Sequence, residues 1–165
     1  MKSQSILIVP TETVEGYAVR LDDESGIREL MRLKERDFDS GKIFTLVPTS
    51  KFEIENYALI PPAAKPLIEK HIPGELTIIL PKNPNFHHFY YNHFNTIGIR
   101  IPDYAPFLKT LSKTGPLILT SANKKGGTPK SITGHLPSTI VDFTSEKPKI
   151  LREGNLKIDL NDYIK

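Results

Sequence analysis

The sequence predicts an α/β fold in which helices pack on a mixed β-sheet. Short apolar runs of the length of buried strands alternate with segments of helical periodicity along the whole chain of 165 residues. Most of the 14 prolines stand at the edges of these apolar runs, where they separate one element from the next. Hydrophobic and charged residues make up 38% and 25% of the chain, which is typical of a folded protein and not of a disordered one. We expect a single domain over residues 1–165.

The first predicted strand, residues 6–9, has the sequence ILIV. It ends at Pro10, which has no N–H to donate to a neighbouring strand. Residues 11–13, Thr-Glu-Thr, follow, so hydroxyls and a carboxylate stand at the edge of the predicted sheet, where α/β proteins commonly bind ligands. The alternative is an ordinary exit from a strand into a loop. Residues 17–21 either extend this strand or pair with it.

A helix is predicted next, from a cap at Asp23 or Ser25 to about Lys34. Its apolar residues recur at helical spacing, and Lys34 continues the apolar stripe at the helix end. A lysine at this position either extends its ammonium group to water or points into a site beside the core. Arg36 lies just beyond the helix, as a plain surface arginine or as a second cation of such a site.

The remaining elements are short and follow one another closely. Strands are predicted at residues 43–47, 76–80, 96–101, 116–119, 138–143 and 149–152, and helices at 50–58, 63–71 and 104–113, the second of them interrupted by Pro66. Residues 83–95 form a loop in which His87, His88 and His93 stand among phenylalanines and tyrosines. A metal site is one interpretation, but the lack of an acidic neighbour and of an i, i+4 histidine pair favours loop or packing histidines.

Composition and missing motifs narrow the possible functions. The chain has no cysteine, which excludes disulfides, thiolate catalysis and cysteine-ligated zinc. It carries neither a P-loop nor a GxGxxG fingerprint. Its apolar runs are too short for a membrane span or a signal peptide, so we expect a cytoplasmic protein that does not bind a membrane. The net charge of +3 permits an anionic ligand without demanding one.

Polar side chains recur where the predicted strands end, at residues 10–13, 100–102, 120–123 and 152–154. If these ends converge, they form one polar cleft that suits phosphates or carboxylates. Its donors would be Lys34, Arg36, Arg100, Ser121, Asn123 and Arg152. The alternatives are solvent exposure for Arg100 on an edge strand and simple turn capping for residues 120–123.

Seven short segments are spread over nearly the whole chain: PTETVEG (10–16), KER (34–36), PGELTIIL (73–80), IGIRIP (97–102), TSAN (120–123), STIVD (138–142) and ILREG (150–154). In the same order, they resemble the motifs PTETVYGL, K-x-R, PGPLTLIL, VGVRIP, TSAN with its S-x-N motif, STVVD and ILRPG. These are the motifs of the YrdC-like threonylcarbamoyl-AMP synthase family. One such segment is a weak signal, whereas seven in family order are specific.

The resemblance implies both a fold and a reaction. The fold is a twisted mixed sheet with helices on both faces, enclosing a concave basic cavity. The reaction joins L-threonine, bicarbonate and ATP into L-threonylcarbamoyladenylate and pyrophosphate, a nucleotidyl transfer that supplies the t6A modification of adenosine 37 in tRNA. Mg²⁺ is the expected cofactor, brought by ATP and held mainly by phosphates and water. The implied partners also include the t6A transferase machinery that receives the product, with tRNA or double-stranded RNA as a further candidate.

The motif match also implies residue roles. The expected catalytic residues are Lys34, Arg36, Ser121 and Asn123. L-threonine would be bound by Thr11, Thr13, Arg100, Ser121 and Ser138. ATP would be bound by Lys34, Arg36, Thr120, Asn123 and Arg152. No protein ligand to a metal ion is expected.

Departures from the family pattern motivate an alternative function. Glu15 stands where the family has tyrosine, Glu75 replaces a proline, and residues 37–50 lack the usual proline-leucine pair and histidine. A carboxylate beside an anion site is repulsive unless it pairs with a cation such as Lys34 or Arg36. The alternative is therefore a non-catalytic RNA- or nucleotide-binding protein on the same fold.

Two further expectations concern the architecture around the cavity. The second domain of longer family members is expected to be absent, because the chain ends soon after ILREG. The basic, glycine-bearing loop at residues 124–127 is a candidate lid.

Overall fold

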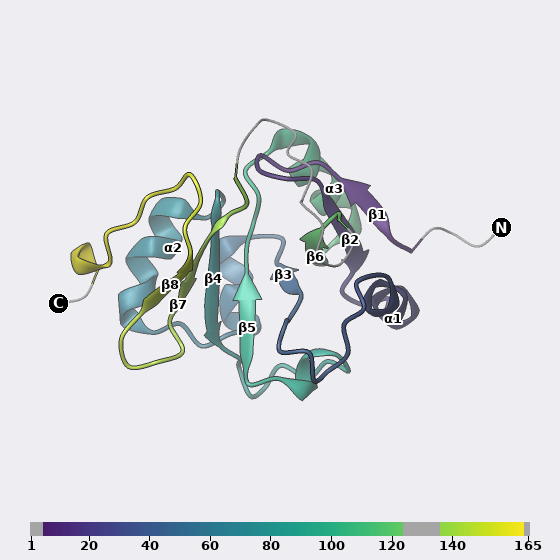
Figure 1. Cartoon of the computed structure of the whole chain (residues 1–165), viewed down its shortest axis with the longest axis horizontal. Helices are drawn as coiled ribbons and strands as arrows, with labels where there is room; N and C mark the ends of the chain where they lie inside the picture. The colour runs from purple at the N-terminus through teal and green to yellow at the C-terminus, as the bar shows by residue number, and fades with distance from the viewer. Residues whose placement is uncertain (1–4, 124–135, 164–165) are drawn as a thin grey trace.

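The computed structural model describes residues 5–123 and 136–163, so the loop 124–127 lies outside the described residues. An eight-stranded mixed sheet with the order β1-β2-β6-β3-β5-β4-β7-β8 forms its centre (Figure 1). The strands are β1 (Leu7–Val9), β2 (Gly16–Arg20), β3 (Thr45–Val47), β4 (Leu76–Pro81), β5 (Thr96–Ile99), β6 (Leu117–Ser121), β7 (Thr139–Asp142) and β8 (Lys149–Arg152). The predicted α/β class with a mixed sheet is confirmed.

The sheet contains both parallel and antiparallel neighbours. The pairs β3–β5 and β4–β7 are parallel, and the other neighbouring strands are antiparallel. β2 therefore pairs with β1 and does not extend it, which decides between the two alternatives for residues 17–21. Strands distant in sequence become neighbours, since β2 pairs with β6 and β4 with β7.

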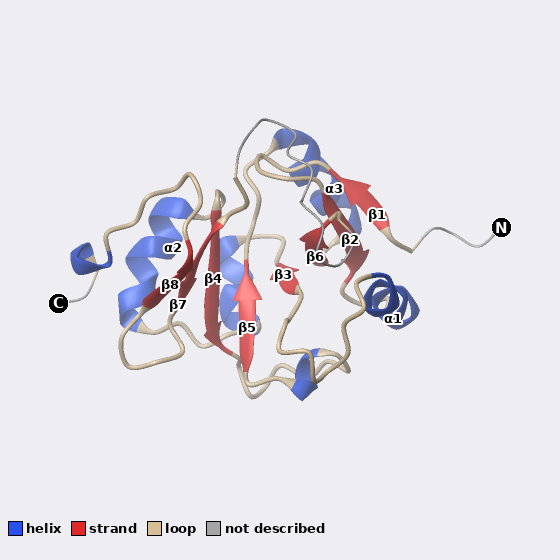
Figure 2. Cartoon of the chain, in the orientation of Figure 1, coloured by secondary structure: helices blue, strands red, loops and turns tan. Residues whose placement is uncertain are grey.

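Three α-helices accompany the described part of the sheet: α1 (Glu24–Leu33), α2 (Lys65–His71) and α3 (Ala105–Thr114). Figure 2 shows α1 and α3 near the strands of the β1 edge and α2 near those of the β8 edge. The α1 helix begins where predicted, because the Asp23 carboxylate accepts the Gly26 N–H at 3.0 Å. Short 3₁₀ turns lie at Lys51–Asn56, Pro62–Ala64, Tyr91–His93 and Leu160–Asp162.

Two element boundaries differ from expectation in ways that matter for the cavity. β6 continues through Thr120 and Ser121, because these residues pair with Tyr17 and Gly16 of β2. β5 ends at Ile99, so Arg100 follows the strand. The expectation that a proline interrupts the second helix is wrong. Pro66 lies in the first turn of α2, where a helix needs no N–H from it.

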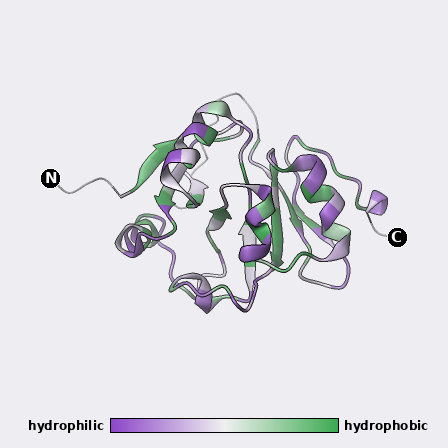
Figure 3. Cartoon of the chain, turned by 180° about the vertical axis from the view of Figure 1, so that it is seen from behind, coloured by the Kyte–Doolittle hydropathy of each residue, from purple (hydrophilic) through white to green (hydrophobic). Residues whose placement is uncertain are grey.

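The hydrophobic core follows the strands. In Figure 3 several strands are coloured as hydrophobic, whereas the helices carry both hydrophobic and hydrophilic colours. Two consecutive tyrosines of the loop before β5, Tyr90 and Tyr91, are completely buried with these strands, at 1% and 0% exposure. Within the described ranges no helix is long and apolar enough to cross a membrane.

Candidate active site

A cavity of about 510 Å³ is walled by residues of β2, β3, β4, β6, β7 and β8 and of the segments after β1 and β5. Its cationic side chains are Arg36, Lys42, Arg100 and Arg152, and Glu15 is the carboxylate among the described lining residues. Its hydroxyl groups belong to Thr11, Thr45, Thr77, Thr120, Ser121 and Ser138. The predicted concave basic cavity is thus present. This excess of cations suits a ligand that carries phosphates or carboxylates.

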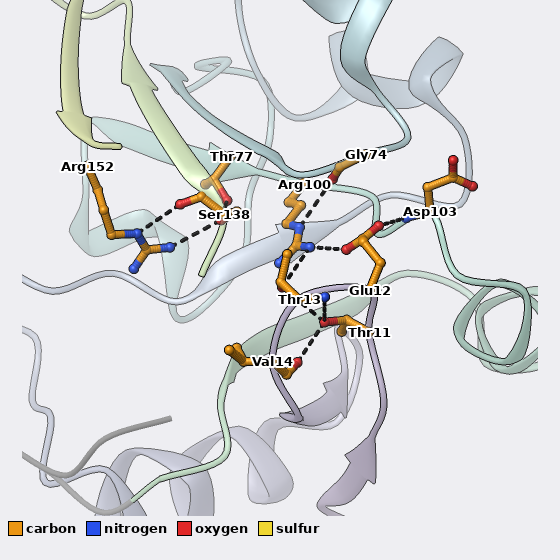
Figure 4. Close-up of polar contacts among 10 residues, drawn as sticks. All are labelled: Thr11, Glu12, Thr13, Val14, Gly74, Thr77, Arg100, Asp103, Ser138 and Arg152. Carbon is orange, nitrogen blue, oxygen red and sulfur yellow. Dashed lines mark hydrogen bonds and ion pairs between the residues drawn. The ribbon is translucent and has the colours of Figure 1, made fainter. Parts of the chain in front are cut away.

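Arg100 lies in the wall of this cavity and is only 6% exposed, which excludes the edge-strand alternative. Its Nη2 donates to Thr13 Oγ1 at 3.0 Å and forms an ion pair with Glu12, and its Nε donates to the Gly74 carbonyl at 3.4 Å (Figure 4). The other oxygen of Glu12 accepts the backbone N–H of Asp103. These contacts fix the guanidinium group against the segment that follows β1.

Glu12 is a site residue to which the motif match assigned no role. Burial raises its pKa, and the neighbouring Arg100 opposes that shift. The only signal in the sequence was its place between two threonines at a strand exit. Nothing in the sequence joined it to an arginine far along the chain.

The hydroxyls of Thr11 and Thr13 are buried and bonded to each other at 3.1 Å. Thr11 Oγ1 donates to the Val14 carbonyl at 2.6 Å and accepts the Thr13 N–H at 3.1 Å. The Thr11 hydroxyl has one proton, which it donates to Val14. In the bond between the two hydroxyls, Thr13 is therefore the donor and Thr11 the acceptor. The segment after Pro10 is therefore a tight hydrogen-bonded turn, with Thr11 at the cavity and Thr13 behind it under Arg100.

Arg152 also lines the cavity and is hydrogen-bonded to Ser138. Its Nε donates to the Ser138 carbonyl at 2.8 Å and its Nη2 to Ser138 Oγ at 3.1 Å, while Ser138 Oγ lies 2.7 Å from Thr77 Oγ1 (Figure 4). The chain after β8 lies directly against the start of β7, because a Cβ atom on Gly154 would stand 2.3 Å from the Pro137 carbonyl oxygen. This close approach holds Arg152 beside Ser138.

Lys34 and Arg36 are separated by a turn. As a result, the side chain of Lys34 lies at the end of β6, whereas that of Arg36 lines the cavity. Glu35 adopts the left-handed conformation with φ of 50°, the Arg36 N–H donates to the Met31 carbonyl at 2.9 Å, and the Glu35 N–H donates to the Arg32 carbonyl at 3.2 Å. This is the Schellman arrangement, in which the last helical carbonyls are satisfied by a reversed turn. The K-x-R spacing thus follows from how α1 ends.

The ammonium group of Lys34 is buried at the end of β6, so it does not extend to water. Its Nζ donates to the carbonyls of Ser121 and Asn123, at 2.9 and 2.8 Å. Burial lowers the pKa of Lys34, and the nearby Arg36 and Lys42 shift it in the same direction. An ammonium group has three donors, and these two hydrogen bonds use two of them.

The expected site residues are largely brought together. Thr11, Arg36, Arg100, Thr120, Ser121, Ser138 and Arg152 line the cavity. Thr13, Lys34 and Asn123 support its wall, since they bond to Arg100, to the β6 carbonyls and to Ser121 Oγ. Lys42 lines the cavity as well, although it was not expected.

Glu15 lies in the cavity wall, on the segment that continues β2 alongside β6. Its carbonyl accepts the Ala122 N–H at 2.8 Å. Between residues of the ranges 5–123 and 136–163, its carboxylate forms no ion pair. It faces the same space as Arg36 and Lys42 without being neutralised by direct contact.

Two of the three histidines of the loop before β5, His88 and His93, pack against neighbouring groups. His88 Nε2 lies 2.7 Å from the Leu21 carbonyl, and His93 stacks on Phe38 with ring centroids 3.6 Å apart. In the part of the chain that the structure describes, no group of three His, Cys, Asp or Glu residues is placed to hold a metal ion.

A family model, Sua5_yciO_yrdC, described as "Telomere recombination", matches residues 1–133. The threonylcarbamoyl-AMP synthase of Psychromonas ingrahamii is 32% identical over 74% of this chain and 65% of its own length. The structure is similar to that of P. abyssi Sua5 complexed with L-threonine, with a TM-score of 0.79, 25% identity, 93% of this chain covered and 51% of that chain. It is also similar to E. coli YciO, with a TM-score of 0.75, 19% identity and coverage of 98% and 87%. The chain therefore spans about half the length of the P. abyssi protein.

Proposed function

Because the chain belongs to the Sua5/YciO/YrdC family, we propose that it is an L-threonylcarbamoyladenylate synthase. One observation carries the proposal: a basic cavity of about 510 Å³ is lined by side chains of the family motifs, among them hydroxyls and arginines. The similarity to a Sua5 complexed with L-threonine supports the choice of amino acid.

In the proposed reaction the amine of L-threonine forms a C–N bond with the carbon of bicarbonate, and water leaves. An oxygen of the resulting carbamate then attacks the α-phosphorus of ATP, and the bond to pyrophosphate breaks. Neither step needs a covalent protein nucleophile. The protein would contribute positioning of the three substrates and stabilisation of the negative charge on the phosphates.

The residue roles implied by the motif match suggest how the substrates are divided within the cavity. Arg100, fixed by Glu12 and Thr13, would receive the carboxylate of L-threonine, and Thr11 and Ser138 would contact the rest of that substrate. Arg36, Thr120 and Arg152 would hold the ATP phosphates. Lys34 would direct its remaining N–H towards the phosphates, and Ser121 and Asn123 would lie near the threonylcarbamoyl group.

Mg²⁺ enters this proposal together with ATP. The donor set of the cavity fits such an ion, because hard cations take oxygen ligands and tolerate several waters. Phosphates and water would supply most of these oxygens, with Glu15 as the nearby carboxylate. The product would pass to the enzymes that transfer the threonylcarbamoyl group to tRNA.

The test incubates the protein with ATP, L-threonine and labelled bicarbonate. We expect pyrophosphate release that depends on L-threonine and a labelled adenylate, both lost in Lys34→Ala. ATP binding without turnover, or pyrophosphate release that ignores L-threonine, would contradict the proposal and favour a nucleotide-binding protein on the same fold. A titration with tRNA at several salt concentrations would then test RNA binding, since phosphate contacts give a steep salt dependence.

A further inference from the structure

The aromatic tract before β5, residues 86–94 with the sequence FHHFYYNHF, has no role in the proposed reaction. It is nevertheless packed against the segment that carries Arg36 and Lys42. Phe38 stacks on His93 with centroids 3.6 Å apart, and Phe44 stacks on Tyr90 at 5.3 Å. The cavity-lining residues between Phe38 and Phe44 are therefore held at both ends by the same tract.

Both backbone polar groups of Phe44 are hydrogen-bonded to tyrosines of the aromatic tract. Its N–H donates to the hydroxyl of Tyr90 at 3.0 Å, and its carbonyl accepts from the hydroxyl of Tyr91 at 2.8 Å. All three side chains are buried, with exposures of 0%, 1% and 0%. Hydrogen bonds between buried groups are costly to leave unmade, so both hydroxyls fix the position of the Phe44 backbone.

Phe44 in turn supports the guanidinium group of Arg36. The Arg36 Cζ lies 5.1 Å from the centroid of the Phe44 ring, within the range of a cation–π interaction. Arg36 lines the cavity, and its main chain is fixed by the turn at the end of α1. The side chain is thus fixed at its base by α1 and at its head by Phe44.

We propose that the aromatic tract, acting through Phe44, positions Arg36 in the cavity wall and thereby sets the affinity for the nucleotide. Phe44 and Tyr90 are positioning residues, because neither has been placed against a substrate. The inference rests on the proposed function for its ligand, ATP. The inference gives a role to residues 86–94, which have none in the proposed reaction.

The test measures the dissociation constants of ATP with Mg²⁺ and of L-threonine separately, by calorimetry. Phe44→Leu keeps an apolar, though smaller, side chain and removes the ring beneath Arg36, whereas Tyr90→Phe keeps the ring and removes the hydroxyl. We expect each to weaken ATP binding about 2- to 30-fold, the range of a cation–π contact, while L-threonine binding stays within about twofold. Phe107→Leu, a buried substitution in α3, is the control for general loss of stability and should change neither constant.

A double-mutant cycle with Arg36→Gln separates positioning from general destabilisation. If Phe44 acts through Arg36, Phe44→Leu has no further effect on ATP affinity once Arg36 is replaced. Additive effects, equal weakening of both ligands, or unchanged ATP affinity in Phe44→Leu and Tyr90→Phe would overturn the inference. A wild-type protein that binds ATP but forms no adenylate would refute the proposed reaction and leave this inference standing. A wild-type protein that binds no ATP would refute both.

Discussion

Glu15 adds a negative charge to a cavity whose other described charged lining residues are cations. It lies in a wall shared with Arg36 and Lys42, and it would offer the proposed nucleotide a negative charge where the family motif has an uncharged tyrosine ring. Its effect depends on whether a cation accompanies the ligand. Without a cation it repels phosphates, whereas with one it supplies an oxygen ligand.

We expect Glu15→Gln to bind metal-free ATP about 2- to 10-fold more tightly than the wild-type protein. Two charges a few ångströms apart in a water-accessible site interact by about 1 kcal/mol, and the substitution removes a repulsive interaction of this size. The measurement is calorimetry in the presence of EDTA. The exposed Glu29→Gln should leave the affinity unchanged, and a weaker affinity of Glu15→Gln would contradict the prediction.

The environment of a single residue could be predicted from the sequence where it depended on neighbouring positions in the chain. The helical spacing that put Lys34 on the apolar stripe correctly allowed for a buried ammonium group. The pairing of Glu12 with Arg100 could not be predicted, because it depends on how the β1–β2 end of the sheet is folded onto the loop after β5. The hydrogen bond between Phe44 and Tyr90 could not be predicted either, because these residues are distant in the sequence and come into contact only in the folded core.

At the scale of elements, the end of α1 determines where the two cations of K-x-R point. The turn requires a left-handed residue between them, and Glu35 fills this position at φ of 50°. A side chain with a Cβ atom is strained there, whereas glycine is not.

Glu35→Gly is therefore expected to raise the free energy of unfolding by about 0.5–1 kcal/mol, in spite of the greater flexibility of glycine in the unfolded chain. Urea denaturation measures the change. Glu35→Ala keeps the Cβ atom and should stay within a few tenths of a kcal/mol of the wild type, about the usual scatter of surface substitutions. A loss of stability in Glu35→Gly would show that the turn is not strained.

The junction of β7 and β8 depends on a close approach of two backbones. A Cβ atom on Gly154 would collide with the Pro137 carbonyl oxygen at 2.3 Å, and backbone atoms cannot move aside as a side chain can. We expect Gly154→Ala to cost about 1–3 kcal/mol of stability and to weaken ATP binding, because Arg152 is displaced from Ser138.

Thermal unfolding and ATP titration check this expectation together. Gly98→Ala is the matched control, since its Cβ atom would meet Thr77 Cγ2 at an ordinary 3.7 Å. Equal stability and equal ATP affinity of the two variants would show that the close backbone contact at Gly154 is not required.

Element positions were predictable from apolar runs and prolines, but their ends were not. β6 is longer than its apolar run, because pairing with β2 recruits Thr120 and Ser121 into the strand. Pairing partners come from the tertiary structure, which a single strand sequence does not contain. The lid expected at residues 124–127 stays a prediction.

At the scale of the whole molecule, His88 couples stability to pH. Its Nδ1 accepts the Tyr90 N–H at 3.2 Å while its Nε2 lies 2.7 Å from the Leu21 carbonyl, so the fold requires the neutral ring with its proton on Nε2. Burial lowers the pKa of His88 below its ordinary value of 6.5. The unfolded chain therefore binds a proton at a higher pH than the folded one.

The contribution of His88 to stability is complete above its unfolded pKa and is lost as the pH falls through its lowered folded pKa. As the pH falls below about 6.5, the ordinary pKa of histidine, we expect the free energy of unfolding to fall, by at most about 1.4 kcal/mol per pH unit for one group. In urea titrations His88→Gln should show a shallower dependence, whereas the exposed His87→Gln should match the wild type. Identical slopes in all three proteins would refute this assignment.

The strand order also has a consequence for biosynthesis. The cavity is walled by Thr11, from the beginning of the chain, and by Ser138 and Arg152, from the last two strands. A ribosome releases the first wall long before the second, and pairing between such distant segments forms slowly. In a nascent chain the cavity therefore cannot be complete until β7 and β8 have left the exit tunnel and paired with the rest of the sheet.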